Sequence, residues 1–322
     1  MSGVTDSRRS VLITGCSPGG IGNSFAREFH RNGLRVLATA RDASSISDLA
    51  ELGIETLSLT VDDSESVKAC FADVEKRLGD KGLDYLVNNA FDVEDILIAV
   101  DYTVPAMEVE LPEVRSVFET NLFAVITMCQ TFLPLLIKAK GTIVQVGSIA
   151  GIMPYVFGSI YNASKAALHS FSDTLRVELA PFGFVHAVPS PHESFLIEAN
   201  SVHVTTVVTG GVQSRIARID RTLKPNSIYT PIEAEYEQRV KHSQKNAMPH
   251  AAYARSVVTQ VLYGSAPWRW LPWAQGRKTW IWEGHASWVI WLLSGGWAWT
   301  GLFGRAMTKM FKLWKINKGT PK

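Results

Sequence analysis

Three residues in the middle of the chain have the types and spacing needed to move a proton to or from a carbonyl or alcohol oxygen. Tyr161 and Lys165 lie four residues apart in a stretch with a helical pattern, so they share one face of a helix. A lysine ammonium near a phenol lowers the tyrosine pKa and makes the tyrosine a usable acid or base near neutral pH. Ser148 follows the strand-like run 141–146, and from a strand end its hydroxyl can point at the same oxygen.

A glycine-rich turn near the N-terminus supports this interpretation, because an isolated Tyr-x-x-x-Lys pair also occurs by chance. The apolar strand at 11–13 runs into the turn 14–22, and a helical pattern follows. Glycines let a pyrophosphate approach the backbone closely, and the N-terminus of a helix supplies N–H donors to it. The turn therefore predicts a dinucleotide site. Its candidate residues are Gly15, Ser17, Gly20, Ile21 and Gly22.

The end of the second strand, 35–40, indicates which dinucleotide is bound. Arg41 follows this strand directly, and Asp42 comes one residue later. An acidic residue at this point binds the ribose 2′-hydroxyl, whereas an arginine pairs with a 2′-phosphate. Arg41 therefore favours NADP(H) over NAD(H). The alternative is a solvated surface arginine.

Strands and helices alternate along the chain, which predicts an α/β fold with a doubly wound parallel sheet of the Rossmann type. The expected strands are 11–13, 35–40, 55–61, 83–87, 142–146 and 202–208. For the last of them, 185–188 competes with 202–208, and the second is preferred because Pro189 stops the first. Ligands of such sheets bind at the carboxyl ends of the strands. Asn88, Ser148 and Gly210 fall there, and a helix at 111–138 carries Asn121.

Composition narrows the classes of function. The 322 residues carry 32 basic and 30 acidic side chains, which gives no reason to expect a nucleic-acid partner. Three scattered cysteines have no metal-ligand spacing and fit a reduced compartment, so no metal site is expected. Residues 1–10 are polar and predict no signal peptide. All ten tryptophans lie between Trp268 and Trp314.

Taken together, these motifs resemble the classical short-chain dehydrogenases/reductases over about residues 8 to 265. More narrowly, the amino-acid sequences of 136–144, 157–161 and 208–212 resemble the fungal NADPH-dependent 1-acyldihydroxyacetone-phosphate reductase branch. The residues that carry the family resemblance are Thr14, Gly15, Gly20, Ile21, Gly22, Asn88, Asn89, Ala90, Asn121, Ser148, Tyr161, Lys165, Thr209, Gly210, Gly211 and Val212.

The resemblance implies roles for individual residues. Tyr161 would exchange a proton with the substrate oxygen, which Ser148 would orient. Lys165 would lower the Tyr161 pKa and bind the nicotinamide ribose, and Asn121 would hold a water that links Lys165 to solvent. Cofactor contacts are implied at Arg41, Thr60, Asp62, Asn88, Tyr161, Lys165, Val212 and Ser214.

Three positions depart from the family pattern. The glycine turn is one residue longer than usual, and Thr60 stands where an aspartate normally meets the adenine, with Asp62 two residues on. Phe91 replaces a glycine after Asn88-Asn89-Ala90, where the cofactor passes close. Residues 91–100 and 184–201 look inserted. They are either genuine surface loops or errors in the deduced coding sequence.

The last fifth of the chain predicts attachment to a membrane. We expect a catalytic domain at 1–265, with a substrate lid at about 215–245, and a tryptophan-rich membrane-associating segment at 266–322. Residues 286–304 carry no charge, but Ser294-Gly295-Gly296 interrupts them, so a helix embedded in one leaflet is preferred over a spanning one. An ordinary buried C-terminal core is the remaining alternative.

The sequence thus predicts an NADP(H)-dependent oxidoreductase that interconverts a ketone and a secondary alcohol on a lipid-like substrate, 1-acyldihydroxyacetone phosphate being one candidate. A ketoreductase of a fungal secondary-metabolite pathway and a catalytically silent membrane-bound relative are the alternatives. The basic tail after Arg305 suits a cytosolic anionic leaflet, so the cytosolic face of the endoplasmic reticulum or of a lipid droplet is the expected location. Family resemblance also implies a homodimer.

Overall fold

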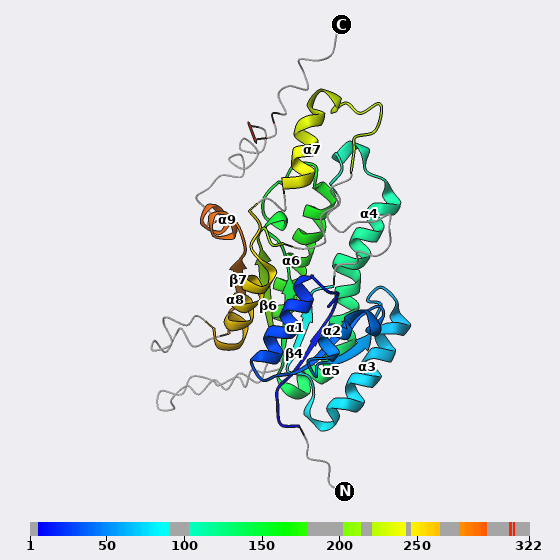
Figure 1. Cartoon of the computed structure of the whole chain (residues 1–322), viewed down its shortest axis with the longest axis vertical. Coiled ribbons are helices and arrows are strands. Elements are labelled where there is room, and N and C mark those ends of the chain that lie inside the picture. Colours follow the sequence, from blue (N-terminus) through cyan, green and yellow to red (C-terminus); the bar gives the residue numbers. More distant parts are fainter. Residues whose placement is uncertain are drawn as a thin grey trace.

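The computed structural model describes residues 6–90, 103–179, 202–213, 221–242, 246–264, 277–294, 309–310 and 312. Within these residues seven parallel strands form one sheet in the order β3-β2-β1-β4-β5-β6-β7 (Figure 1). The expected doubly wound architecture is confirmed, with the order reversing between β1 and β4. The strands are β1 (Ser10–Ile13), β2 (Arg35–Ala40), β3 (Glu55–Ser58), β4 (Tyr85–Asn88), β5 (Thr142–Val146), β6 (His203–Thr209) and β7 (Trp280–Glu283).

Helices cover both faces of the sheet and form two hydrophobic cores. Successive side chains of a strand point to opposite faces, so Val11 and Ile13 enter the core that holds Tyr253, and Leu12 enters the core that holds Phe132. The helices are α1 (Ile21–Arg31), α2 (Ser47–Ala50), α3 (Ser64–Leu78), α4 (Leu111–Phe118), α5 (Ala124–Ala139), α6 (Ser159–Leu179), α7 (Glu233–His242), α8 (His250–Tyr263) and α9 (Ser287–Ser294).

The strand β7 corrects the expected domain boundary at residue 265. Trp280–Glu283 pairs in parallel with Thr206–Thr209 of β6, and Ile281 is buried in the main core. Residues 280–283 therefore extend the sheet beyond the expected boundary, and membrane association of the residues that follow stays a prediction. Trp280–Glu283 was not predicted as a strand, because tryptophan suits a half-buried strand as well as a membrane interface.

The two candidate insertions lie outside the described residues, and so does the competing strand at 185–188. The preferred strand, 202–208, is confirmed as β6, which pairs with β5 from Thr142↔His203 onward. Of the expected lid, residues 221–242 are described. They contain the short turn η7 (Thr230–Ile232) and the helix α7.

The expected helix at 111–138 is confirmed, but a π-helical turn, η4 (Glu119–Phe123), joins α4 to α5. Among the described helices, Leu111–Ala139 alone is long and apolar enough to cross a membrane by length and composition. Core helices pass the same test, and this one places Phe132, Leu135 and Leu136 in the core under the sheet.

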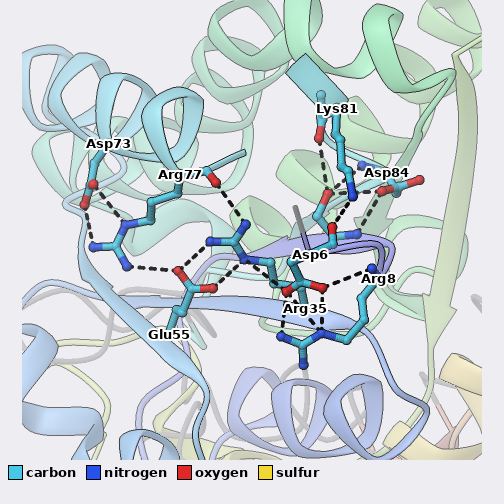
Figure 2. A network of polar contacts seen from close by, with 10 residues as sticks. Asp6, Arg8, Arg35, Glu55, Asp73, Arg77, Lys81 and Asp84 are labelled. Atoms are coloured by element: carbon cyan, nitrogen blue, oxygen red, sulfur yellow. Dashed lines mark hydrogen bonds and ion pairs between the residues drawn. The ribbon is translucent and has the colours of Figure 1, made fainter. Parts of the chain in front are cut away.

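Charged side chains gather at the amino ends of β2 and β3 (Figure 2). Arg35, the first residue of β2, pairs with Glu55, the first residue of β3, with 2.6 Å between Nε and Oε1. Arg77, in the last turn of α3, binds Glu55 at 3.1 Å and Asp73 at 2.9 Å. Asp6 joins the group through Arg35, with 3.8 Å between its Oδ2 and the Arg35 Nε, and also binds Arg8 at 2.7 Å. This network connects α3 and the residues around Asp6 to the amino ends of the strands. The glycine turn lies at the opposite, carboxyl ends.

Candidate active site

The glycine turn at the carboxyl end of β1 is packed too closely for side chains. Gly15 has φ +71°, and a Cβ there would lie 2.7 Å from the Cα of Ala90. A Cβ on Gly22 would lie 2.2 Å from the carbonyl oxygen of Gly15 and 2.5 Å from Nδ2 of Asn89. The helix α1 begins at Ile21, and no described side chain caps its first turn. The backbone surface and the helix N-terminus left open by these glycines fit a pyrophosphate.

The ends of β1 and β4 are fastened together beneath this turn. The Thr14 hydroxyl accepts hydrogen bonds from the backbone N–H groups of Asn89 at 3.0 Å and Ala90 at 2.8 Å. The Asn89 amide donates in return to the carbonyls of Thr14 at 2.9 Å and Gly15 at 3.0 Å. Thr14 and Asn89 thus set the shape of the nucleotide turn.

The side-chain amide of Asn88, an expected cofactor contact, also binds groups within the protein. Its Nδ2 donates to Oε1 of Gln145 on β5 at 3.1 Å and lies 3.5 Å from Sγ of Cys129 on α5. The Gln145 amide also reaches that sulfur, at 3.3 Å. The Asn88 side chain therefore serves to hold β4, β5 and α5 together.

Arg41 lies where the sequence predicts, at the end of β2, and is partly buried. The adjacent Asp42 caps the short helix η1 (Ala43–Ile46) by accepting from Ser44 N at 2.8 Å and Ser44 Oγ at 2.6 Å. These hydrogen bonds from the Ser44 hydroxyl and backbone lower the pKa of the Asp42 carboxyl. The Asp42 carboxylate is thus engaged by Ser44 within the protein.

The remaining predicted cofactor contacts lie at three further places. Thr60 is partly buried just after β3, and its N–H donates to the Ser66 hydroxyl at 2.9 Å, whereas Asp62 is exposed. Of this pair Thr60 lies closer to the sheet. Val212 is buried beyond β6 and bridges to Met248. Ser214 and Phe91 lie outside the described residues.

Tyr161 and Lys165 lie in the first two turns of α6, with the Lys165 Nζ 5.8 Å from the centre of the Tyr161 ring. The Lys165 side chain is 1% exposed, and its Nζ donates to the Val146 carbonyl at 3.2 Å, at the end of β5. Burial lowers the pKa of Lys165 to about 7. Ser148, two residues beyond Val146, is also buried, and its Oγ accepts from Ala150 N at 3.1 Å. The structure thus brings the three predicted residues to the end of one strand.

Asn121 reaches this group from the π-helical turn. Its Nδ2 donates to the Ser164 hydroxyl at 3.0 Å, and that hydroxyl donates to the Tyr161 carbonyl at 2.8 Å. The Asn121 Oδ1 is buried and has no hydrogen-bond partner in the described part of the chain. A buried acceptor of this kind fits an ordered water, as the expected proton relay requires.

One neighbour of these residues was missed in the sequence. The Nε2 of His169 accepts the backbone N–H of Ser148 at 3.3 Å. His169 lies four residues beyond Lys165, so Tyr161, Lys165 and His169 form one stripe along α6. Extending the spacing of four by one more step would have found it.

Comparisons with known proteins agree with this geometry. The short chain dehydrogenase family model matches residues 9–192. The NADPH-dependent 1-acyldihydroxyacetone phosphate reductase of Schizosaccharomyces pombe is 36% identical over 88% of this chain and 88% of its own length. The short-chain dehydrogenase virD of Hypocrea virens is 33% identical over 98% of this chain and 96% of its own. The structure of a short-chain dehydrogenase from Streptomyces avermitilis has a TM-score of 0.68 at 23% identity, with complete coverage of both chains.

Proposed function

Since the chain belongs to the short-chain dehydrogenase family, we propose that it uses NADP(H) to interconvert a ketone and a secondary alcohol on a lipid-like substrate. The observation that carries the proposal is the meeting of Ser148, Tyr161 and Lys165 at the end of β5. The glycine turn beside them fits a dinucleotide. Membership of the family makes the chain an oxidoreductase, and NADP(H) is supported by Arg41 and by the NADPH-dependent relative.

The cofactor, when bound, supplies or accepts the hydride. Gly15 and Gly22 would admit its pyrophosphate, and Arg41 would pair with its 2′-phosphate. The Tyr161 hydroxyl gives a proton to the carbonyl oxygen during reduction, or takes one from the alcohol during oxidation. The Ser148 hydroxyl holds that oxygen in place.

Lys165 and Asn121 support the proton transfer by Tyr161 without contacting the substrate oxygen themselves. A lysine whose pKa lies near 7 passes between its charged and neutral forms at neutral pH. Its charged form stabilises the Tyr161 phenolate. The Asn121 Oδ1, which has no hydrogen-bond partner among the described residues, would hold the water through which the proton is replaced from solvent.

The experiment that tests this function is turnover by the purified full-length chain in detergent. NADPH oxidation is followed with 1-acyldihydroxyacetone phosphate and with a panel of polyketide and terpenoid ketones, and NADH is used alongside. We expect turnover with NADPH and much weaker turnover with NADH. Preference for the acyl phosphate supports the lipid enzyme, and preference for the cyclic ketones supports the secondary-metabolite alternative.

A silent protein is the third possibility. Fluorescence titration with NADPH separates it from an enzyme whose substrate is missing from the panel, because a silent protein binds neither nucleotide. Such a result would direct attention to Phe91 and the residues that follow.

The helix α9 supports attachment to a membrane. Trp288, Trp291 and Leu292 are 66%, 56% and 41% exposed, and their spacing places them on one face. Tryptophans on the outer face of an apolar helix suit the interface of a bilayer. On the inner face Ile290 packs against Met153, five residues after Ser148. A lipid-like substrate would therefore enter close to the membrane.

We further propose that the attachment is monotopic and on the cytosolic face of the endoplasmic reticulum or a lipid droplet. Flotation with anionic lipid vesicles tests it. The double variant W288S/W291S should lose most of its binding, whereas V177S, which removes a 72% exposed apolar side chain from α6, should keep it. Equal binding of the two variants would contradict the role of α9.

Resistance to carbonate extraction would favour a spanning segment over a monotopic one. Light scattering in detergent tests the expected homodimer.

A further inference from the structure

We infer that His169 is a positioning residue, which fixes the backbone of Ser148 and so the direction of its hydroxyl. The inference rests on the proposed function, because it assigns a task within the same site. The role of His169 requires no contact with substrate or cofactor. It acts through the N–H group of Ser148, which its Nε2 accepts at 3.3 Å.

The imidazole lies in a slot that two glycines make for it. A Cβ on Gly147 would stand 2.2 Å from the His169 Nε2, and a Cβ on Gly151 would stand 2.9 Å from its Cε1. These glycines flank Ser148 at distances of one and three residues in sequence. The loop around the catalytic serine is therefore shaped to rest on this ring.

The ring also packs on the last strand of the sheet. Trp280 of β7 meets His169 edge-on, with 5.5 Å between ring centroids. The His169 side chain is buried. Since the ring contacts Trp280 of β7 and lies against two glycines, its nitrogen stays directed at Ser148.

One helix face thus holds the strand end at two points. Lys165 donates to the carbonyl of Val146, and one turn later His169 accepts the N–H of Ser148. The Ser148 Oγ is fixed in turn by Ala150 N. Proton transfer depends on the position of a hydroxyl to within an ångström or less, so loss of either contact on the backbone should slow the reaction.

An acceptor nitrogen carries no proton, so the arrangement requires neutral His169 with its proton on Nδ1. Burial, followed by the nearby charge of Lys165, lowers the pKa of His169 to about 4, while Asp173 acts in the opposite direction. Both charged groups lie on α6, and β7 contributes the uncharged Trp280 ring. The contact with Ser148 therefore persists through the neutral range and is lost only in acid.

The test compares two substitutions of similar size. His169→Leu keeps bulk but removes the acceptor, whereas His169→Gln keeps an acceptor oxygen at a similar reach. We expect kcat to fall about 10- to 100-fold in H169L, with NADPH affinity unchanged, and to recover most of its value in H169Q. The wild type should also lose kcat in acid through a group of pKa about 4, and this limb should be missing in H169Q.

A second measurement is independent of turnover. Amide hydrogen exchange at Ser148 should be slow in the cofactor-free wild type, faster in H169L and slow again in H169Q. If the wild type turns over no carbonyl but shows this exchange pattern, the proposed function fails and the positioning stands. Equal exchange in both variants, or an equal loss of kcat in both, overturns the inference.

Discussion

The two ends of the same parallel sheet are built in opposite ways. At the amino end the charges of Arg35, Glu55 and Arg77 are paired with one another and remain partly exposed to water. At the carboxyl end Lys165 is buried, with its Nζ donating to the Val146 carbonyl, and Asn121 keeps an acceptor unused among the described residues. The amino end has its polar groups satisfied within the protein. The carboxyl end has polar groups that a ligand or water would complete.

Free energy is therefore distributed unevenly between the two ends. Paired surface charges add a little stability each, about 0.2–1 kcal/mol. A buried lysine and a buried unpaired acceptor cost stability, because both are removed from water without full compensation. The fold is thus stabilised at the amino ends of its strands and carries its reactive groups at their carboxyl ends. The four predictions below test that separation, beginning with the largest effect.

Tyr161→Phe should reduce kcat about 1,000-fold, since the proton donor is lost while the ring remains. The unfolding midpoint should change little, because Tyr161 is only partly buried, and the NADPH dissociation constant is measured alongside to separate binding from proton transfer. Steady-state kinetics, a binding titration and thermal unfolding measure the three quantities. Substantial turnover in this variant would remove Tyr161 from the mechanism.

The buried Lys165 should make stability depend on pH in the cofactor-free protein. Its pKa is about 7 when folded and about 10.4 when unfolded, so the unfolded chain binds an extra proton between these values. The free energy of unfolding should therefore rise with pH across this window, by at most about 1.4 kcal/mol per pH unit. Lys165→Met should lose this slope. Urea unfolding at pH 7, 8 and 9 measures it, and identical slopes would show that Lys165 stays charged.

Gly22→Ala should weaken NADPH binding and lower the free energy of unfolding by about 1–3 kcal/mol, as expected for overpacking. The added methyl group would meet the Gly15 carbonyl oxygen at 2.2 Å. Gly20→Ala is the matched control for the loss of stability, because the nearest contact of its added methyl group, Ser17 O, lies at 3.0 Å. Fluorescence titration and urea unfolding compare them. Similar behaviour of the two variants would mean that the turn relaxes.

Glu55→Gln, at the amino end, should lower the free energy of unfolding by about 1 kcal/mol or less and leave kcat unchanged. Burial raises the pKa of Glu55, but the hydrogen bonds and charges of Arg35 and Arg77 outweigh it, so the pKa is lowered overall. The wild type should thus lose this contribution as the pH falls below the usual range of a glutamate, and E55Q should not.

Glu65→Gln, in the exposed pair with Lys68, is the control for that measurement and should have a smaller effect. Urea unfolding at pH 7 and at pH 3 compares the two variants. A loss of kcat in E55Q would show that the two ends are coupled after all.

The sheet and its reactive edge were predictable because they follow local rules. Short apolar strands alternate with helical patterns, and the carboxyl ends of parallel strands always meet at one edge. Tyr161 and Lys165 could be paired from their spacing alone. Their link to Ser148 needed only the preceding strand.

Features that depend on distant contacts were not predictable in the same way. Trp280–Glu283 became a strand because the edge of β6 was available to it, which its tryptophan-rich composition does not reveal. Asn88 turned toward Gln145 and Cys129 for a similar reason, since neighbouring strands decide where a side chain at a strand end points. The fold of the chain, rather than its local pattern, determines both.

The π-helical turn at Glu119–Phe123 changes the directions in which the side chains of one continuous helix point. An α-helix advances by about 100° per residue, so a wider turn rotates everything beyond it relative to what precedes it. Removing one residue from this turn would restore a regular helix but rotate Asn121 away from Ser164 or move the apolar stripe of α5 off the sheet. The number of residues in the π-helical turn between α4 and α5 is therefore as important as the identity of Asn121. Substitutions of the other residues in this turn should be tolerated far better than deletions.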